Sequence, residues 1–230
     1  MLLAVDLHIH SCLSPCADPD MTPNNIAAMA GLKGLAAIAV CDHNSCLNAW
    51  ACIRAGERHG VLVVPGVEAT TAEELHALCY FPDYDALRDF CGLLESKQPF
   101  FPNNPDLLGE QLILDENDIE TGSCSRWLGQ AVQLTVEEME RETLARGGVM
   151  VPSHINRPSQ SLLSNLGFIP PSLKAKVMET KGEYALPAKY RAIRSSDAHN
   201  LWDILEDGFP FEAQECSVEA ILNGLRTGLF

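Results

Sequence analysis

Short apolar segments alternate with stretches of helical period at the start of the chain, and this alternation constrains the fold most. Apolar runs at 2–6, 35–40 and 61–64 are separated by helical patterns at about 23–33 and 47–59. Strands that alternate with helices predict βαβ units, in which the strands lie parallel in one sheet. The sequence therefore predicts an α/β fold.

The middle of the chain interrupts this alternation. A further strand is predicted at 76–81 and a helix at about 84–95. Residues 96–134 then carry several prolines and glycines with only short apolar pieces, which indicates an insertion of loops and a hairpin. We place this insertion over the functional site and expect it to select the substrate, because variable loops commonly set specificity.

Helix and strand signals return after the insertion. The sequence Thr135-Val136-Glu137-Glu138 is a capping box that predicts a helix to about Arg146. Short strands follow at 149–152, 176–180 and 192–195, and a final amphipathic helix is predicted at 218–226. A chain of 230 residues that is 47% hydrophobic can bury one substantial core. We predict a single domain over 1–230.

Composition restricts the location and the partners. No apolar run is long enough to span a membrane and no secretory signal precedes residue 10, so we expect a cytoplasmic protein with no membrane partner. The nine cysteines form no CxxC pair, which fits reduced thiols. With 16 basic against 31 acidic residues the net charge is −15, which predicts no binding of extended nucleic acid. Bound divalent ions would still attract a small phosphorylated substrate.

Six of the seven histidines fall in short motifs at or near the ends of predicted strands. His8-Ile9-His10 directs both imidazoles to one side, because alternate strand residues share a face, and this suits chelation of one ion. The other motifs are Cys41-Asp42-His43, Gly66-Val67-Glu68, Pro152-Ser153-His154 and Ser196-Asp197-Ala198-His199, with His76 at a further strand. In an α/β barrel such strand ends converge on one face. Imidazole with carboxylate is the ligand mixture of zinc, manganese or iron.

These motifs, in this order, resemble the PHP (polymerase and histidinol phosphatase) superfamily of metal-dependent phosphoesterases. Its members carry HxH after the first strand, DH after the second, GxE after the third, two later histidines and a final DxH. The resemblance spans most of the chain and implies a distorted (β/α)7-type barrel, similar to a TIM barrel, around two or three divalent ions (Mn, Zn or Fe). It implies metal ligands at His8, His10, His43, Glu68, His76, His154, Asp197 and His199.

One departure concerns the ninth ligand. Many relatives carry Ser-Asp-Gly shortly after HxH, with the aspartate as ligand, whereas here the segment reads Ser14-Pro15-Cys16-Ala17-Asp18-Pro19-Asp20. Asp18 is the first candidate, followed by Asp20 and Cys16. Aspartate is also common in turns, so a purely structural role for Asp18 is the alternative. The number of ions, two or three, depends on this choice.

Four residues have expected roles beyond simple ligation. We expect Asp42 to orient a ligating histidine, as carboxylates beside metal sites commonly do. Glu68 is expected to bridge two ions and, with Asp197, to act in catalysis. Arg157 resembles the arginine that follows the corresponding histidine in related phosphatases, and its planar fork suits two phosphate oxygens. A surface arginine is the alternative for Arg157.

The predicted function is hydrolysis of a small phosphomonoester or nucleotide by a metal-dependent phosphoesterase. Two alternatives belong to other classes. A metal-dependent amidohydrolase would use similar ligands, although many carry a catalytic lysine and no lysine lies in the motifs here. A metal-stabilised binding or regulatory module would not catalyse, although such modules typically lose ligands.

Overall fold

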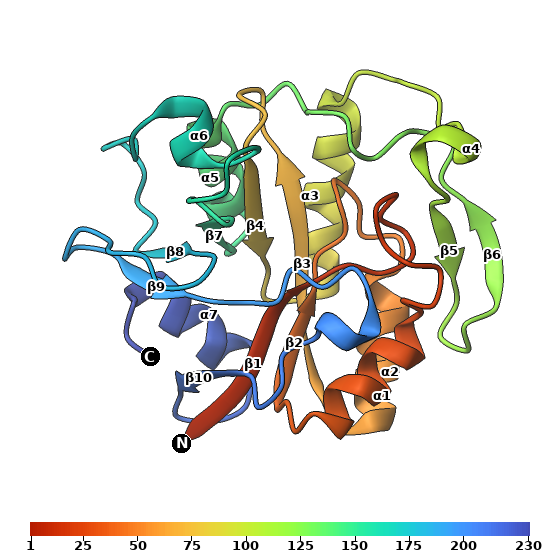
Figure 1. Cartoon of the computed structure of the whole chain (residues 1–230), viewed down its shortest axis with the longest axis horizontal. Coiled ribbons are helices and arrows are strands. Elements are labelled where there is room, and N and C mark those ends of the chain that lie inside the picture. The colour runs from red at the N-terminus through yellow and green to blue at the C-terminus, as the bar shows by residue number, and fades with distance from the viewer.

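A curled six-stranded sheet forms half of a barrel at the centre of the molecule (Figure 1). The computed structural model describes all residues from 1 to 230. Its strands are β1 (Leu2–Ile9), β2 (Ala37–Val40), β3 (Leu62–Thr70), β4 (His76–Tyr80), β7 (Val149–Pro152) and β10 (Phe209–Glu212). Their order is β10-β1-β2-β3-β4-β7, and a parallel pair, β8 (Val177–Glu179) and β9 (Arg191–Ile193), follows β7. The predicted α/β class and distorted barrel are confirmed.

Strand direction differs from the predicted parallel sheet in part. β1, β2 and β3 are parallel, whereas β4 is antiparallel to β3, and β7 is antiparallel to β4. β4 reverses because a short turn at 71–75 joins it to β3, and parallel strands need a much longer crossover. As a result, the start of β4 lies at the same edge as the ends of β1, β2, β3 and β7.

Helices cover the sheet, and five of them begin within two residues of the predicted starts, whereas the short helix at 162–166 was not predicted. The helices are α1 (Pro23–Leu32), α2 (Ala49–His59), α3 (Tyr84–Lys97), α5 (Val136–Ala145), α6 (Leu162–Leu166) and α7 (Val218–Thr227). Thr22 caps α1, the Thr135–Glu138 capping box starts α5, and Ser217 caps α7. None of the helices combines the length and the apolar composition needed to cross a membrane.

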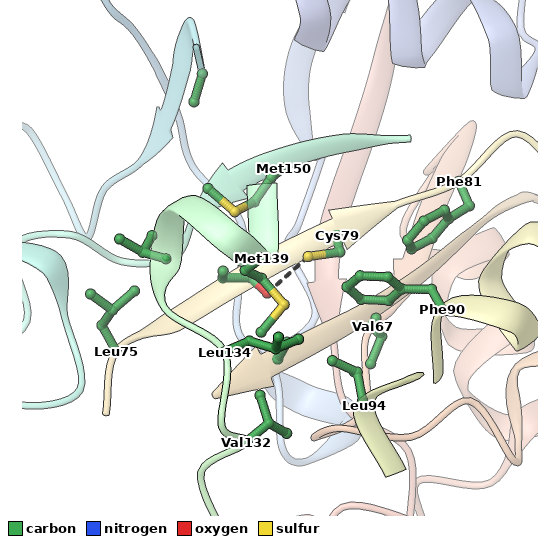
Figure 2. Packing of buried hydrophobic residues seen from close by; sticks show 14 of the residues in the cluster. Val67, Leu75, Cys79, Phe81, Phe90, Leu94, Val132, Leu134, Met139 and Met150 are labelled. Atoms are coloured by element: carbon green, nitrogen blue, oxygen red, sulfur yellow. Dashed lines mark hydrogen bonds between the residues drawn. The ribbon is translucent and has the colours of Figure 1, made fainter. Parts of the chain in front are cut away.

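The largest apolar cluster lies between the sheet and helices α3 and α5. Phe81 and Phe90 pack with ring centroids 4.9 Å apart, and Met139 of α5 and Met150 of β7 fill the cluster beside them (Figure 2). A second cluster fills the half-barrel against α7, and a third lies under α1 and α2. Packing on both faces fixes the strands, and thereby the positions of the side chains at their ends.

The insertion contains the predicted hairpin and packs against the loop after β1. The short helix α4 (Pro105–Leu108) precedes the antiparallel strands β5 (Leu112–Leu114) and β6 (Glu120–Ser123), which stand at the right of Figure 1. Gly109, at φ +91°, closely approaches the Pro15 carbonyl, where a Cβ would clash. The buried Asn48 donates to the Leu112 carbonyl at 3.0 Å and accepts from the Leu114 N–H at 2.9 Å.

Replacing this asparagine tests how the hairpin is held. Asn48→Ala leaves two backbone groups of β5 without a partner, and each costs about 1–3 kcal/mol if it stays buried. We expect a lower free energy of unfolding in urea and faster amide exchange at Leu114. The control Asn223→Ala, on the exposed face of α7, should change stability by less than about 0.5 kcal/mol. Equal stability of both variants would contradict this role of Asn48.

Candidate metal centre

The eight residues with predicted ligand roles converge at one edge of the half-barrel. A register shift in β1 between Asp6 and Ile9 helps to place the first two. Leu7 belongs to the cluster inside the half-barrel, whereas Ile9 belongs to the cluster under α1, so the inward face changes parity across the shift. Bulges of this kind re-aim side chains beside active sites. His8 and His10 are fully buried, with their Nε2 atoms 3.1 Å apart.

Glu68 of β3 lies at the centre of the cluster. Its carboxylate is fully buried, and five imidazoles approach it within 3.1 to 3.4 Å. The contacts are His8 Nε2 at 3.3 Å, His10 Nε2 at 3.4 Å, His43 Nδ1 at 3.2 Å, His76 Nδ1 at 3.1 Å and His154 Nε2 at 3.3 Å. His76 reaches Glu68 from the start of β4, because this strand runs antiparallel to β3.

One carboxylate oxygen of Asp197 faces the cluster, and the other oxygen faces two cationic side chains. Its Oδ1 lies 3.4 Å from the Nε2 atoms of both His8 and His10. Its Oδ2 lies 3.2 Å from Arg157 and 3.3 Å from Lys181. Asp197 and His154 have φ of +58° and +24°, values that non-glycine residues rarely adopt. Strained backbone of this kind is concentrated at functional sites.

The donor set fits divalent metal ions. Three overlapping groups have ligand atoms within 4.8 Å of one another, namely His10/His43/His199, His8/His10/Asp197 and His43/Glu68/His76. Five atoms of the cluster are buried without a hydrogen-bond partner: His43 Nδ1, Glu68 Oε2, His76 Nδ1, and Nδ1 and Nε2 of His154. Buried polar atoms are nearly always satisfied. Unpaired nitrogen and oxygen atoms gathered in one cluster are what a metal site requires.

Asp42 orients a ligand, but not the neighbouring His43. It accepts hydrogen bonds from the Ser11 N–H at 2.8 Å and from the Ser14 hydroxyl at 2.7 Å. The Ser14 hydroxyl in turn accepts from His10 Nδ1 at 2.9 Å. This chain of hydrogen bonds fixes the His10 ring with Nε2 turned toward Glu68.

Glu179 supports the site and was not found by sequence reasoning. This buried carboxylate, at the end of β8, accepts from His8 Nδ1 at 3.1 Å, from the Ser153 hydroxyl at 3.0 Å and from the His154 N–H at 2.9 Å. It therefore orients two predicted ligands from different strands. Its position at a strand end was the only signal in the sequence, because no histidine or second carboxylate marks it as a motif.

The structure does not bring Asp18 into the cluster. Its carboxylate is exposed and accepts a hydrogen bond from the Asp20 N–H at 2.9 Å, as a turn aspartate does. Asp20 is exposed as well, whereas Cys16 lines the pocket beside the cluster. Arg157 also lines this pocket, in contact with Asp197 rather than on a remote surface.

The cluster forms the floor of a pocket of about 490 Å³. This volume lies within the roughly 300–1,000 Å³ common for small-molecule sites. The protein side chains that line it include ligand candidates, Arg157 and Gln160. The insertion contributes Leu107, Leu108, Trp127 and Gly129 to the same pocket. The insertion thus borders the site, as its predicted place over the site requires.

Burial and charge shift the histidines in opposite directions. Burial lowers the pKa of His8, but the carboxylates of Glu179 and Glu68 outweigh it and raise this pKa well above its usual value. For His43, burial and the neighbouring His10 hold the pKa well below its usual value. The same two causes lower the pKa of His199 to about 4. Without bound ions, these shifts favour the protonated form of His8 and the neutral forms of His43 and His199.

The decisive comparison is with protein families. A model of the PHP domain matches residues 6–134, which is more than half of the chain. The chain belongs to the PHP family. Members of this family are metal-dependent hydrolases, which agrees with the cluster described above. No curated protein matches the chain significantly.

Solved structures share the fold at low identity. The lesion-specific endonuclease Q from Pyrococcus furiosus matches with a TM-score of 0.73 and 20% identity, over 100% of this chain and 57% of that one. This PHP chain therefore spans little more than half the length of the endonuclease. A candidate metal-dependent phosphoesterase from Bifidobacterium adolescentis matches with a TM-score of 0.57 and 16% identity, over 96% and 94% of the two chains.

One expectation about partners is wrong. Endonuclease Q has been solved in complex with a 27-mer duplex substrate that has an abasic lesion at the active site. The protein in that complex matches this chain with a TM-score of 0.71 and 21% identity. The fold therefore accommodates extended nucleic acid, and net charge alone is no ground to exclude it. Net charge is summed over the whole surface, whereas binding depends on the local potential, and here Arg157 and Lys181 stand beside the site.

Glu179→Gln tests the support of His8. The change keeps the shape of the side chain but removes the charge that holds His8 Nδ1–H, and loss of such a partner commonly weakens metal binding by about 10–100-fold. We expect this loss in a competition titration with a metal-binding dye. The control Glu140→Gln alters another buried glutamate, which accepts from the Lys174 and Ala175 N–H groups. Equal affinity in both variants would contradict the assigned role.

Metal binding should also depend on pH. Because the pKa of His8 is raised, an ion must displace its proton, so affinity falls as pH drops below this pKa and levels off above it. His43 and His199 are already neutral at pH 7 and release no proton there. We expect release of about one to two protons per protein at pH 7, from His8 and from His10, because Asp197 and Glu68 raise the pKa of His10 in spite of its burial. Calorimetry in two buffers of different ionisation enthalpy measures this number, and a value of zero would refute the assignment.

Proposed function

We propose that this chain is a metal-dependent phosphoesterase that uses two or three divalent ions (Mn, Zn or Fe). The observation that carries the proposal is the pairing of the ligand cluster with two cations on one carboxylate. Arg157 and Lys181 both contact Asp197 Oδ2, while Asp197 Oδ1 faces the histidines. A phosphate is an anion with several oxygens, and this arrangement offers it both kinds of positive charge.

The roles of the protein groups follow from these contacts. The ions would be held by His8, His10, His43, Glu68, His76, His154, Asp197 and His199, and would supply Lewis-acid activation of water and of the phosphoryl group. Glu68, surrounded by five imidazoles, is positioned to join two ions. Arg157 and Lys181 would hold the remaining phosphate oxygens. Since ligands come from β1 through the segment after β9, residues 1–230 would act as one domain, with 96–134 as its insertion.

The substrate that this proposal favours is a small phosphomonoester or nucleotide. A pocket of about 490 Å³ accommodates such a molecule. A phosphate ester within a nucleic acid presents the same reacting group, and the resemblance to endonuclease Q keeps this source among the substrates to test. The amidohydrolase alternative gains no support, because Lys181 is 38% exposed and paired with Asp197 rather than buried as a catalytic lysine.

Phosphate release with added metal tests the proposal. The chelated protein is assayed with manganese, zinc or iron on histidinol phosphate, nucleoside monophosphates and 3′,5′-bisphosphates, and in parallel on a duplex with an abasic site. We expect metal-dependent hydrolysis of at least one phosphate ester. His10→Ala and Glu68→Gln should lower the rate by more than the roughly 10–100-fold typical of losing a supporting residue.

Two control variants separate the site from general effects. His59→Ala removes an exposed histidine at the end of α2, and Glu140→Gln neutralises a buried glutamate remote from the cluster. Both should keep metal content and turnover. Hydrolysis without metal, or normal turnover in Glu68→Gln, would overturn the proposal, and silence on every ester with metal bound would favour a non-catalytic module.

A further inference from the structure

The pocket above the cluster has an apolar part that metal chemistry does not use. The insertion lines it with Leu107, Leu108 and Trp127, and the loop after β1 adds Pro15. Leu107 is 79% exposed, and the Trp127 ring is only half-buried. Apolar groups that are gathered in one pocket and bordered by polar residues commonly mark a ligand-binding groove. The part of a substrate attached to the reacting phosphate is in reach of these groups.

Trp127 is held in a defined position. Its backbone N–H donates to the Phe101 carbonyl at 2.8 Å, and the Phe101 ring meets the indole edge-on with centroids 5.8 Å apart. Gly129 lies directly against the indole, because a Cβ at this position would stand 2.6 Å from Trp127 Cζ2. Because Gly129 has no side chain, the indole ring can occupy this position. Such a fixed aromatic surface binds a planar partner at low entropic cost.

The path of the insertion connects this surface to the metal centre. The segment from β6 to α5 crosses above the end of β3 and the start of β4 in Figure 1. The Asn44 side chain donates to the Leu128 carbonyl at 2.7 Å, and Val132 N–H donates to the Thr70 carbonyl at 2.9 Å. Asn44 follows the ligand candidate His43 directly. Trp127 is thus tied to the same backbone that carries the cluster.

We propose that Trp127 is a specificity-determining residue that stacks on an aromatic ring of the substrate, with a nucleobase as the ring. This inference rests on the proposed function, which places the reacting phosphate at the metal centre. Bases stack on aromatic side chains irrespective of sequence, because each base has a π-face. Gln160, exposed on the same pocket and held at φ +52°, offers an amide to the edge of a base.

Two matched substrates test this subsite. Adenosine 5′-monophosphate and ribose 5-phosphate share the phosphate and the sugar, and only the first has a base. With the metal-loaded protein, the ratio of kcat/KM for the two should fall by about 5- to 150-fold in Trp127→Ala, the range that stacking on an aromatic side chain commonly supplies. Trp127→Phe should keep most of the ratio, and Gly129→Ala should lower it by displacing the indole.

The control is Trp202→Ala, which removes a tryptophan that is 82% exposed in the short helix 201–203, outside this pocket. It should leave the ratio unchanged. An unchanged ratio in Trp127→Ala would overturn the subsite, even if both esters are hydrolysed and the phosphoesterase itself stands. A 5′-phosphorylated oligonucleotide assayed beside the monophosphate assigns the base to a strand end or to a free nucleotide, and in either case the rate must depend on Trp127.

Equilibrium binding tests the subsite even if no ester is hydrolysed. Titration with adenosine 5′-monophosphate should quench the tryptophan fluorescence. Ribose 5-phosphate should change the fluorescence only at higher concentrations, if at all. The quenching should persist in Trp202→Phe and disappear in Trp127→Phe. Failure of the monophosphate to quench, or quenching that survives in Trp127→Phe, would overturn the subsite independently of catalysis.

Discussion

The buried carboxylate of Glu68 is the constraint around which the rest of the site is arranged. A charged group without partners is very costly to bury, and here five imidazoles within 3.4 Å surround it. They hold the pKa of Glu68 well below its usual value in spite of burial. The imidazoles come from the ends of β1 and β7, from the start of β4 and from the loop after β2. Strand direction, register and core packing together place these side chains around one carboxylate.

This arrangement requires local departures from regular structure. β1 shifts register between Asp6 and Ile9, and the backbone is strained at His154 and Asp197, where φ is positive. Each strained residue costs on the order of 1–3 kcal/mol. The apolar clusters on both faces of the sheet oppose relaxation of these segments, and Glu179 adds direct contacts by joining His8 to the His154 N–H. Ions bound between the ligands would stabilise the same conformation further.

The sequence predicted features that depend on local patterns. Helix starts at Thr22, Thr135 and Ser217 follow from capping residues, and the candidate ligands stand in short motifs. The direction of β4 was not predictable, because alternating apolar residues look the same in parallel and antiparallel strands. Glu179 and Lys181 were not predicted from the sequence, because their roles arise from contacts with His8 and Asp197, which are distant in the chain. The nucleic-acid error had a related cause, since total charge contains no information on where the cations gather.

Asp197 connects the charge of the histidine cluster with the charge at the rim of the pocket. One of its oxygens faces the histidines and the other faces Arg157 and Lys181, so a metal ion held there and the two cations would share a single carboxylate. An ion bound to Asp197 would weaken the attraction between this carboxylate and the two cations, because the carboxylate would then have less negative charge to offer them. Metal binding would therefore make the rim of this acidic protein more attractive to an anion. The charge at the mouth of this pocket would thus depend on whether metal ions are bound at its floor. The amino-acid composition alone does not reveal this dependence.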